Sequence, residues 1–170
     1  MVNLSKELQS KEVRRNNKYN HVVNLLVYGS LDEEEGSKMQ KTFPYIKDLI
    51  IFAAMVGKKY NIQEEVEKES TKIVLGTFEG TSGTSKDTLV DQHNIIFMFG
   101  LSVLRDMKYM RDENVDEVIH VFERFSNGGL NIIDGWLRDS QWNPMVLLDK
   151  IVDEMRSSSA DEEVEVVNPF

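Results

Sequence analysis

The segment from Pro44 to Val56 constrains the fold of this chain more than any other. After its first turn it is almost entirely apolar, so a helix formed by it would be apolar around its circumference. Because a membrane span needs ~20 residues, such a short helix belongs in a protein core, where Ala53 and Ala54 would let a neighbour approach closely. Proline suits the first turn and glycine suits a helix stop, so we expect the helix to end at Gly57.

Five further segments carry apolar residues at the three- and four-residue spacing of helices. We expect these helices at residues 17–28, 89–105, 114–127, 130–137 and 144–155. The first should end at Gly29, and the third at Gly128 and Gly129, since glycine tolerates a left-handed backbone. The sequence therefore predicts an all-α protein, a compact bundle of about six helices.

Residues 72–78 have the β-branched and aromatic content of a short strand. We find no second extended segment that could pair with them, and a lone strand is not stable. We therefore expect a packed extended segment that carries Phe78 into the core.

The charge of the chain is unevenly distributed. The net charge is -9 overall, but residues 1–20 hold five bases and two acids. We divide the chain into a basic N-terminal leader at 1–16, a single helical domain at 17–156 and a disordered acidic tail at 157–170. The simplest interpretation of the basic stretch is a solvated face, and the acidic body disfavours direct contact with a phosphate backbone.

Several classes of site are disfavoured by composition and spacing. The chain has no cysteine, which excludes disulfides and thiolate chemistry and fits a cytoplasmic location. The start of the chain has no apolar core of a signal peptide, and no apolar run is long enough for a membrane span. The loop from Gly80 to Lys86 lacks the spacing of a phosphate-binding loop, and the histidines show no metal-ligand spacing. We therefore predict no catalytic residue, no metal and no cofactor.

Candidate partner-binding residues come from four places in the chain. Lys47 and Asp48 are the polar interruptions of the apolar helix; a surface lysine and a helix-end acid are the simpler interpretation, and a polar contact with a partner is the alternative. Phe170 ends an acidic tail that either aids solubility or docks into a basic pocket of a partner, as the Pro-Phe tip of bacterial single-stranded-DNA-binding proteins does. The methionines are interpreted as core fillers, although an exposed subset could form an adaptable binding surface. The full candidate set is Arg14, Arg15, Lys18, Lys47, Asp48, Lys86 and Phe170.

Two segments carry a family resemblance. Phe43-Pro-x-x-Lys-Asp-Leu-x-x-Phe-Ala-Ala-x-x-Gly57 and Phe125-Ser-Asn-Gly-Gly-Leu130 resemble DNA phosphorothioation-associated protein 4, over about Lys18 to Leu148 and without the acidic tail. That family accompanies the Dnd gene clusters, which mark bacterial DNA with sulfur and attack unmarked phage DNA.

The resemblance implies a non-enzymatic accessory or adaptor protein of an antiphage modification-restriction system, with proteins of the same gene cluster as partners. Three alternatives stay open. The basic leader could bind DNA directly, the acidic surface could mimic DNA and regulate a nuclease, or the many acids could include the carboxylates of a small metal-dependent nuclease. The oligomeric state is not predicted.

Overall fold

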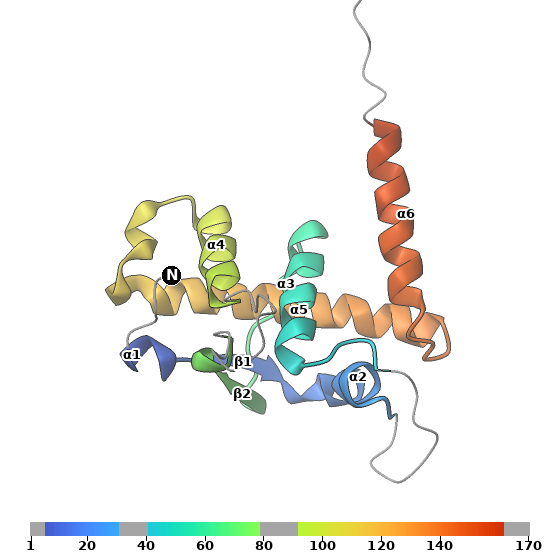
Figure 1. The fold of residues 1–170 in the computed structure, drawn as a ribbon, viewed down its shortest axis with the longest axis horizontal. Coiled ribbons are helices and arrows are strands. Elements are labelled where there is room, and N and C mark those ends of the chain that lie inside the picture. Colours follow the sequence, from blue (N-terminus) through green and yellow to red (C-terminus); the bar gives the residue numbers. More distant parts are fainter. Residues whose placement is uncertain (1–5, 31–40, 79–91, 162–170) are drawn as a thin grey trace, which may run out of the picture. The chain divides into compact units, whose positions relative to one another are not determined.

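The computed structural model of the protein describes residues 6–30, 41–78 and 92–161. The expectation of a mostly helical protein is confirmed, but a small sheet is present as well (Figure 1). Residues 1–134 and 135–170 form two compact units, and the longest helix runs from the first into the second. The elements are α1 (Lys6–Gln9), β1 (Glu12–Asn16), α2 (Asn20–Val23), α3 (Ile46–Lys59), β2 (Ser70–Val74), α4 (His93–Leu104), α5 (Val115–Asp139) and α6 (Val146–Asp161).

The expected first helix at residues 17–28 is present as a continuous helical stretch. A 3-10 turn, Asn17–Tyr19, leads into α2, and a wider π-type turn, Asn24–Tyr28, follows it. The apolar stripe of this stretch is buried, including Tyr19, Val22 and Leu26. Gly29 ends it in the left-handed conformation, with a φ of 72°, as the sequence indicated.

The prediction that no strand is paired was wrong. β2 forms an antiparallel pair with β1, in a register that runs from Glu12 opposite Val74 to Asn16 opposite Ser70. Residues Glu12–Asn16 belong to the segment interpreted above as a basic leader, and their charged composition hid the strand. Beyond β2, a 3-10 turn at Leu75–Phe78 places Phe78 in the core, as expected.

The predicted helix stops at Gly57 and at Gly128-Gly129 were also wrong. α3 continues to Lys59, and α5 passes through both later glycines without a break, so two expected helices are one. These glycines instead allow close contact between α3 and α5. A Cβ atom added at Gly129 would overlap the Ala53 carbonyl oxygen and lie 2.5 Å from the Ala53 carbonyl carbon. One added at Gly57 would overlap the Phe125 carbonyl oxygen.

The other helices agree more closely with expectation. α4 ends before Arg105, whose φ is 54°, while its expected start at Leu89 lies outside the described residues. α6 continues to Asp161, so the first residues of the expected disordered tail are helical. The rest of that tail, with Phe170, and the loop containing Lys86 also lie outside the described residues. No helix in the described ranges is long and apolar enough to cross a membrane.

Most methionines expected as core fillers are instead at the surface. Met98 and Met107, on and just after α4, are 70% and 73% exposed. In the second unit Met145 and Met155 are 56% and 67% exposed. The buried core of the first unit is built from branched aliphatic and aromatic side chains of the helical stretch 17–28, α3 and α5.

Candidate functional site

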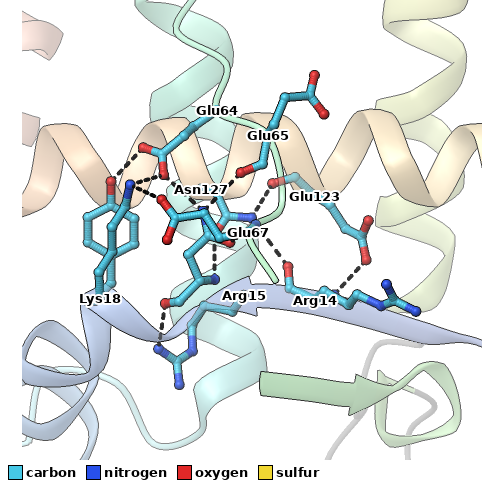
Figure 2. A network of polar contacts seen from close by, with 10 residues as sticks. Arg14, Arg15, Lys18, Glu64, Glu65, Glu67, Glu123 and Asn127 are labelled. Carbon is cyan, nitrogen blue, oxygen red and sulfur yellow. Dashed lines mark hydrogen bonds and ion pairs between the residues drawn. The ribbon is translucent and has the colours of Figure 1, made fainter. Parts of the chain in front are cut away.

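A buried polar cluster joins α5 to the sheet. Glu123 and Asn127 lie four residues apart and therefore on one face of α5, and they are only 6% and 0% exposed. The Glu123 carboxylate accepts a hydrogen bond from the Arg14 backbone N–H at 2.6 Å. Asn127 accepts one from the Asn16 N–H at 2.8 Å and donates a longer one to the Arg14 carbonyl at 3.3 Å (Figure 2). Two helix side chains thus bind backbone groups of Arg14 and Asn16 on the edge of β1 that faces away from β2.

The Asn16 side chain extends this cluster to the segment between α3 and β2. Its carbonyl oxygen accepts from the Glu67 N–H at 2.7 Å, and its amide donates to the Glu64 carboxylate at 2.9 Å and the Glu65 carbonyl at 3.0 Å. Gly128 lets this segment pack on α5, because a Cβ atom there would lie 2.6 Å from the Ile62 carbonyl carbon. Three segments distant in sequence therefore meet at one asparagine.

The Glu64 carboxylate contacts three side chains of the cluster. Besides Asn16 it contacts Lys18 Nζ at 2.6 Å and accepts from the Tyr19 hydroxyl at 2.6 Å, while Lys18 also contacts Glu67 at 2.6 Å. The hydrogen bond that Lys18 donates to Glu64 is the main reason that the pKa of Lys18 is raised. Burial, with the Glu64 hydrogen bond, raises the pKa of Tyr19 strongly, so this phenol is neutral at physiological pH.

At Glu123, burial shifts the pKa in one direction, while hydrogen bonding and a nearby charge shift it in the other. Burial raises the pKa of its carboxyl group, while the Arg14 backbone N–H and His120 oppose this shift. The second carboxylate oxygen lies 3.7 Å from His120 Nδ1. Glu123 is therefore held by hydrogen bonding more than by a full ion pair.

The basic residues near the start of the chain have three different environments. Arg14 is exposed, whereas Lys18 is paired with two glutamates. Arg15 is 5% exposed, and its guanidinium donates only a long bond, 3.3 Å, to the Asn16 carbonyl oxygen. Its Nε has no hydrogen-bond partner among the described residues, and burial lowers its pKa. These side chains do not form one continuous basic surface.

The two polar residues of α3 contact other parts of the chain. Lys47 Nζ donates to the Thr77 carbonyl oxygen at 3.1 Å, and the Asp48 carboxylate accepts from Gln92 Nε2 at 2.6 Å. Lys86 and Phe170, the last two candidate residues, lie outside the described part of the chain. A role of these residues in partner binding remains a prediction.

The sequence interpretation did not single out five residues of the polar cluster: Asn16, Glu64, Glu67, Glu123 and Asn127. A usable signal was present only for Glu123 and Asn127, which are polar residues at helical spacing beside the buried aromatic residues Phe122 and Phe125. In the described ranges no group of three or more histidine, aspartate or glutamate side chains is placed to hold a metal ion. His21 Nε2 lies 2.6 Å from the carboxylate of the buried Asp134.

A family model described as DNA sulphur modification system-associated protein 4 matches residues 12–168. Comparison with curated proteins and with solved structures found no match. The matched range exceeds the Lys18 to Leu148 expected from the sequence, since it takes in β1 and most of the acidic C-terminal segment. With nearly the whole chain covered, the protein belongs to the DNA sulphur modification system-associated protein 4 family.

Proposed function

We propose that this protein is a non-enzymatic adaptor of a bacterial DNA phosphorothioation system that restricts unmarked phage DNA, and that it acts by binding proteins of the same gene cluster. The family description supports the link to DNA sulphur modification. The polar cluster supports a structural role for its acids, because Glu123 binds the backbone of β1 beside Asn127, and Glu64 binds the Asn16 side chain.

The observation that carries the adaptor proposal is the exposure of long apolar side chains. Met98 and Met107 are 70% and 73% exposed although methionine is usually a buried residue. Flexible, polarizable methionines at a surface adapt to a partner, and they are enriched in the buried centres of interfaces. Lys58 of α3 lies over the ring of Phe99 of α4 at 5.3 Å, which places a cation beside α4.

The direct test is recovery of partners from cells that carry the whole gene cluster. The tagged full-length chain should recover at least one cluster-encoded protein, and recovery should fall when Met98 and Met107 are both replaced by glutamate. The matched control replaces two exposed lysines outside the proposed surface, Lys59 and Lys68, with glutamate. Recovery of no cluster-encoded protein by the unaltered chain would refute the adaptor proposal.

Direct DNA binding receives less support from the geometry. Of the three basic candidates near β1, Lys18 is engaged by carboxylates and Arg15 is buried, which leaves Arg14 exposed. Neutralising DNA phosphates requires several accessible cations, and the resulting affinity would fall steeply with salt. Salt-dependent binding that disappears in an Arg14→Glu variant would favour this alternative over the adaptor.

A further inference from the structure

The two edges of the small sheet differ in how their hydrogen-bonding groups are satisfied. Asn17 N–H donates to the Glu69 carbonyl, and Leu75 N–H to the Lys11 carbonyl, which fixes the hydrogen-bonded pairs of the antiparallel ladder. In such a ladder the alternate residues direct their N–H and C=O groups away from the partner strand. On β1 these are the groups of Glu12, Arg14 and Asn16, and side chains of α5 bind both backbone groups of Arg14 and the Asn16 N–H.

On β2 the corresponding residues are Ser70, Lys72 and Val74. The Val74 carbonyl accepts from the Thr77 hydroxyl at 2.6 Å. The backbone groups of Ser70 and Lys72 that point away from β1 have no hydrogen-bond partner among the described residues. Lys72 is exposed and Val74 is 45% exposed, so two side chains of this strand are accessible to solvent. An open strand edge is a template for another extended segment.

The side chains at this edge favour an acidic segment. Arg14 lies directly opposite Lys72 in the register, so two cations share one face of the sheet. Like charges that face each other across strands are destabilising. Glu12 reduces the repulsion from one side through its contact with Lys72 Nζ at 2.9 Å. An added strand would supply a second acid on the open side of Lys72, and an apolar residue beside Val74 would cover exposed surface.

We propose that the free edge of β2 binds an extended acidic segment of a partner protein as a third strand, with an acidic side chain beside Lys72. Backbone hydrogen bonds to Ser70 and Lys72 supply affinity, and the charge of Lys72 selects the segment. The same charge disfavours a second copy of this edge, because the lysines of the two copies would approach each other. This inference rests on the adaptor function and specifies one surface and one class of ligand for it.

The test is a titration of the isotope-labelled full-length chain with a synthetic capped peptide, Thr-Val-Glu-Val-Glu-Val-Thr, followed by NMR. We expect amide shifts centred on Ser70 to Val74 and binding that weakens with salt. The same peptide with lysine in place of glutamate should bind at least about tenfold more weakly, which corresponds to ~1.4 kcal/mol. A peptide N-methylated on alternate amides should not bind, because it cannot complete the ladder. Absence of binding by the acidic peptide, equal binding of both charged peptides, or shifts outside β2 would overturn the proposal.

Variants of Lys72 separate the backbone contribution from the charge. Lys72→Pro removes the outward N–H together with the lysine charge and leaves the inward bonds to β1 in place, so it should abolish peptide binding. Lys72→Gln keeps the N–H and should weaken binding to the level of the lysine peptide. Lys68→Gln, outside the strand, should bind like the unaltered chain. Thermal unfolding of each variant shows whether it is folded, and full binding by folded Lys72→Pro would also overturn the proposal.

The failure of this inference is distinguishable from failure of the adaptor function. If the tagged Lys72→Pro chain recovers the same cluster-encoded protein as the unaltered chain, the edge is not the docking surface although the adaptor function stands. If the unaltered chain recovers none while the acidic peptide binds β2, the adaptor function fails and the edge remains a peptide-binding site.

Discussion

Replacing Gly129 by alanine tests the contact between α3 and α5. The added Cβ atom would lie 2.5 Å from the Ala53 carbonyl carbon and 3.0 Å from the Ala53 Cα. Carbon atoms in ordinary contact are ~3.5–4.0 Å apart, so the two helices would have to separate by about 1 Å. Because the obstruction is backbone, no side-chain rotation can relieve it. Leu49 and Ile50 on the same helix are fully buried, so a shift of α3 would disturb the core.

The expected magnitude follows from two opposing terms. Alanine is favoured over glycine inside a helix by ~1 kcal/mol, and overpacking of a well-packed site costs ~1–3 kcal/mol and occasionally more. A clash with a backbone carbonyl belongs at the upper end, so we expect a net loss of about 2 kcal/mol in the free energy of unfolding. For a chain of this size that is a fall of about 4–8 °C in Tm.

Gly135 provides the matched control on the same helix. A Cβ atom added there meets nothing within 4 Å, so only the propensity term applies. Gly135→Ala should raise the free energy of unfolding by ~0.5–1 kcal/mol. Both variants are measured by urea unfolding followed by far-UV circular dichroism. If Gly129→Ala is as stable as Gly135→Ala, the close approach of α3 to Gly129 is refuted.

Three further substitutions test the polar cluster. Asn127→Ala leaves the buried Asn16 N–H unpaired and should cost about 2–3 kcal/mol in urea unfolding, whereas a loss below ~0.5 kcal/mol would contradict its role. Burial raises the pKa of the Glu123 carboxyl group, so its protonated form stabilises the fold at low pH, and this contribution is lost as the group ionises. The Glu123→Gln variant should therefore gain stability relative to the unaltered chain as pH rises from about 4.3 through the raised folded-state pKa. Unfolding of the two proteins across pH 4 to 8 measures this difference, and a constant difference would refute it. Lys18→Gln should cost less than ~1 kcal/mol, since the lysine side chain is 44% exposed, and the cost should shrink in high salt; a larger or salt-independent loss would show that the contact with Glu64 is not a surface ion pair.

The helices were predictable because their signal is local. The apolar spacing of residues 17–28 and the all-round apolar character of the segment after Pro44 both depend on neighbours within one or two turns. The burial of Leu49, Ile50 and Ala53 and the left-handed stop at Gly29 match that reading. These features depend little on the rest of the chain.

β1 was not predictable for the opposite reason. Its residues, Glu-Val-Arg-Arg-Asn, lack the apolar alternation of a strand, and two of its buried positions are Arg15 and Asn16. What stabilises it is distant: β2 on one edge, and Glu123 and Asn127 on the other. Local composition therefore indicated a solvated leader, while the tertiary contacts determined the strand.

The glycines of α3 and α5 show how one local pattern can have two meanings. A glycine after an apolar run is equally suited to a helix stop and to a close helix crossing, because both need a missing Cβ atom. Only the partner helix distinguishes the two cases. Gly57 faces the Phe125 carbonyl, and Gly129 faces the Ala53 carbonyl. The missing side chain of each glycine therefore leaves room for the backbone of the other helix. The two segments that carry the family resemblance are therefore complementary halves of one contact.

That contact also sets the position of the sheet. With α3 held against Gly129, the chain leaving α3 passes over Gly128, where the Glu64 N–H donates to the Arg124 carbonyl at 2.9 Å. The same segment then brings Glu64 to Asn16, and Asn127 on α5 binds the Asn16 backbone. Since both interactions act on β1, they fix its register and leave β2 as the outer strand. A disturbance at the helix crossing should therefore weaken peptide binding at the edge of β2, although no atom of the crossing belongs to that edge.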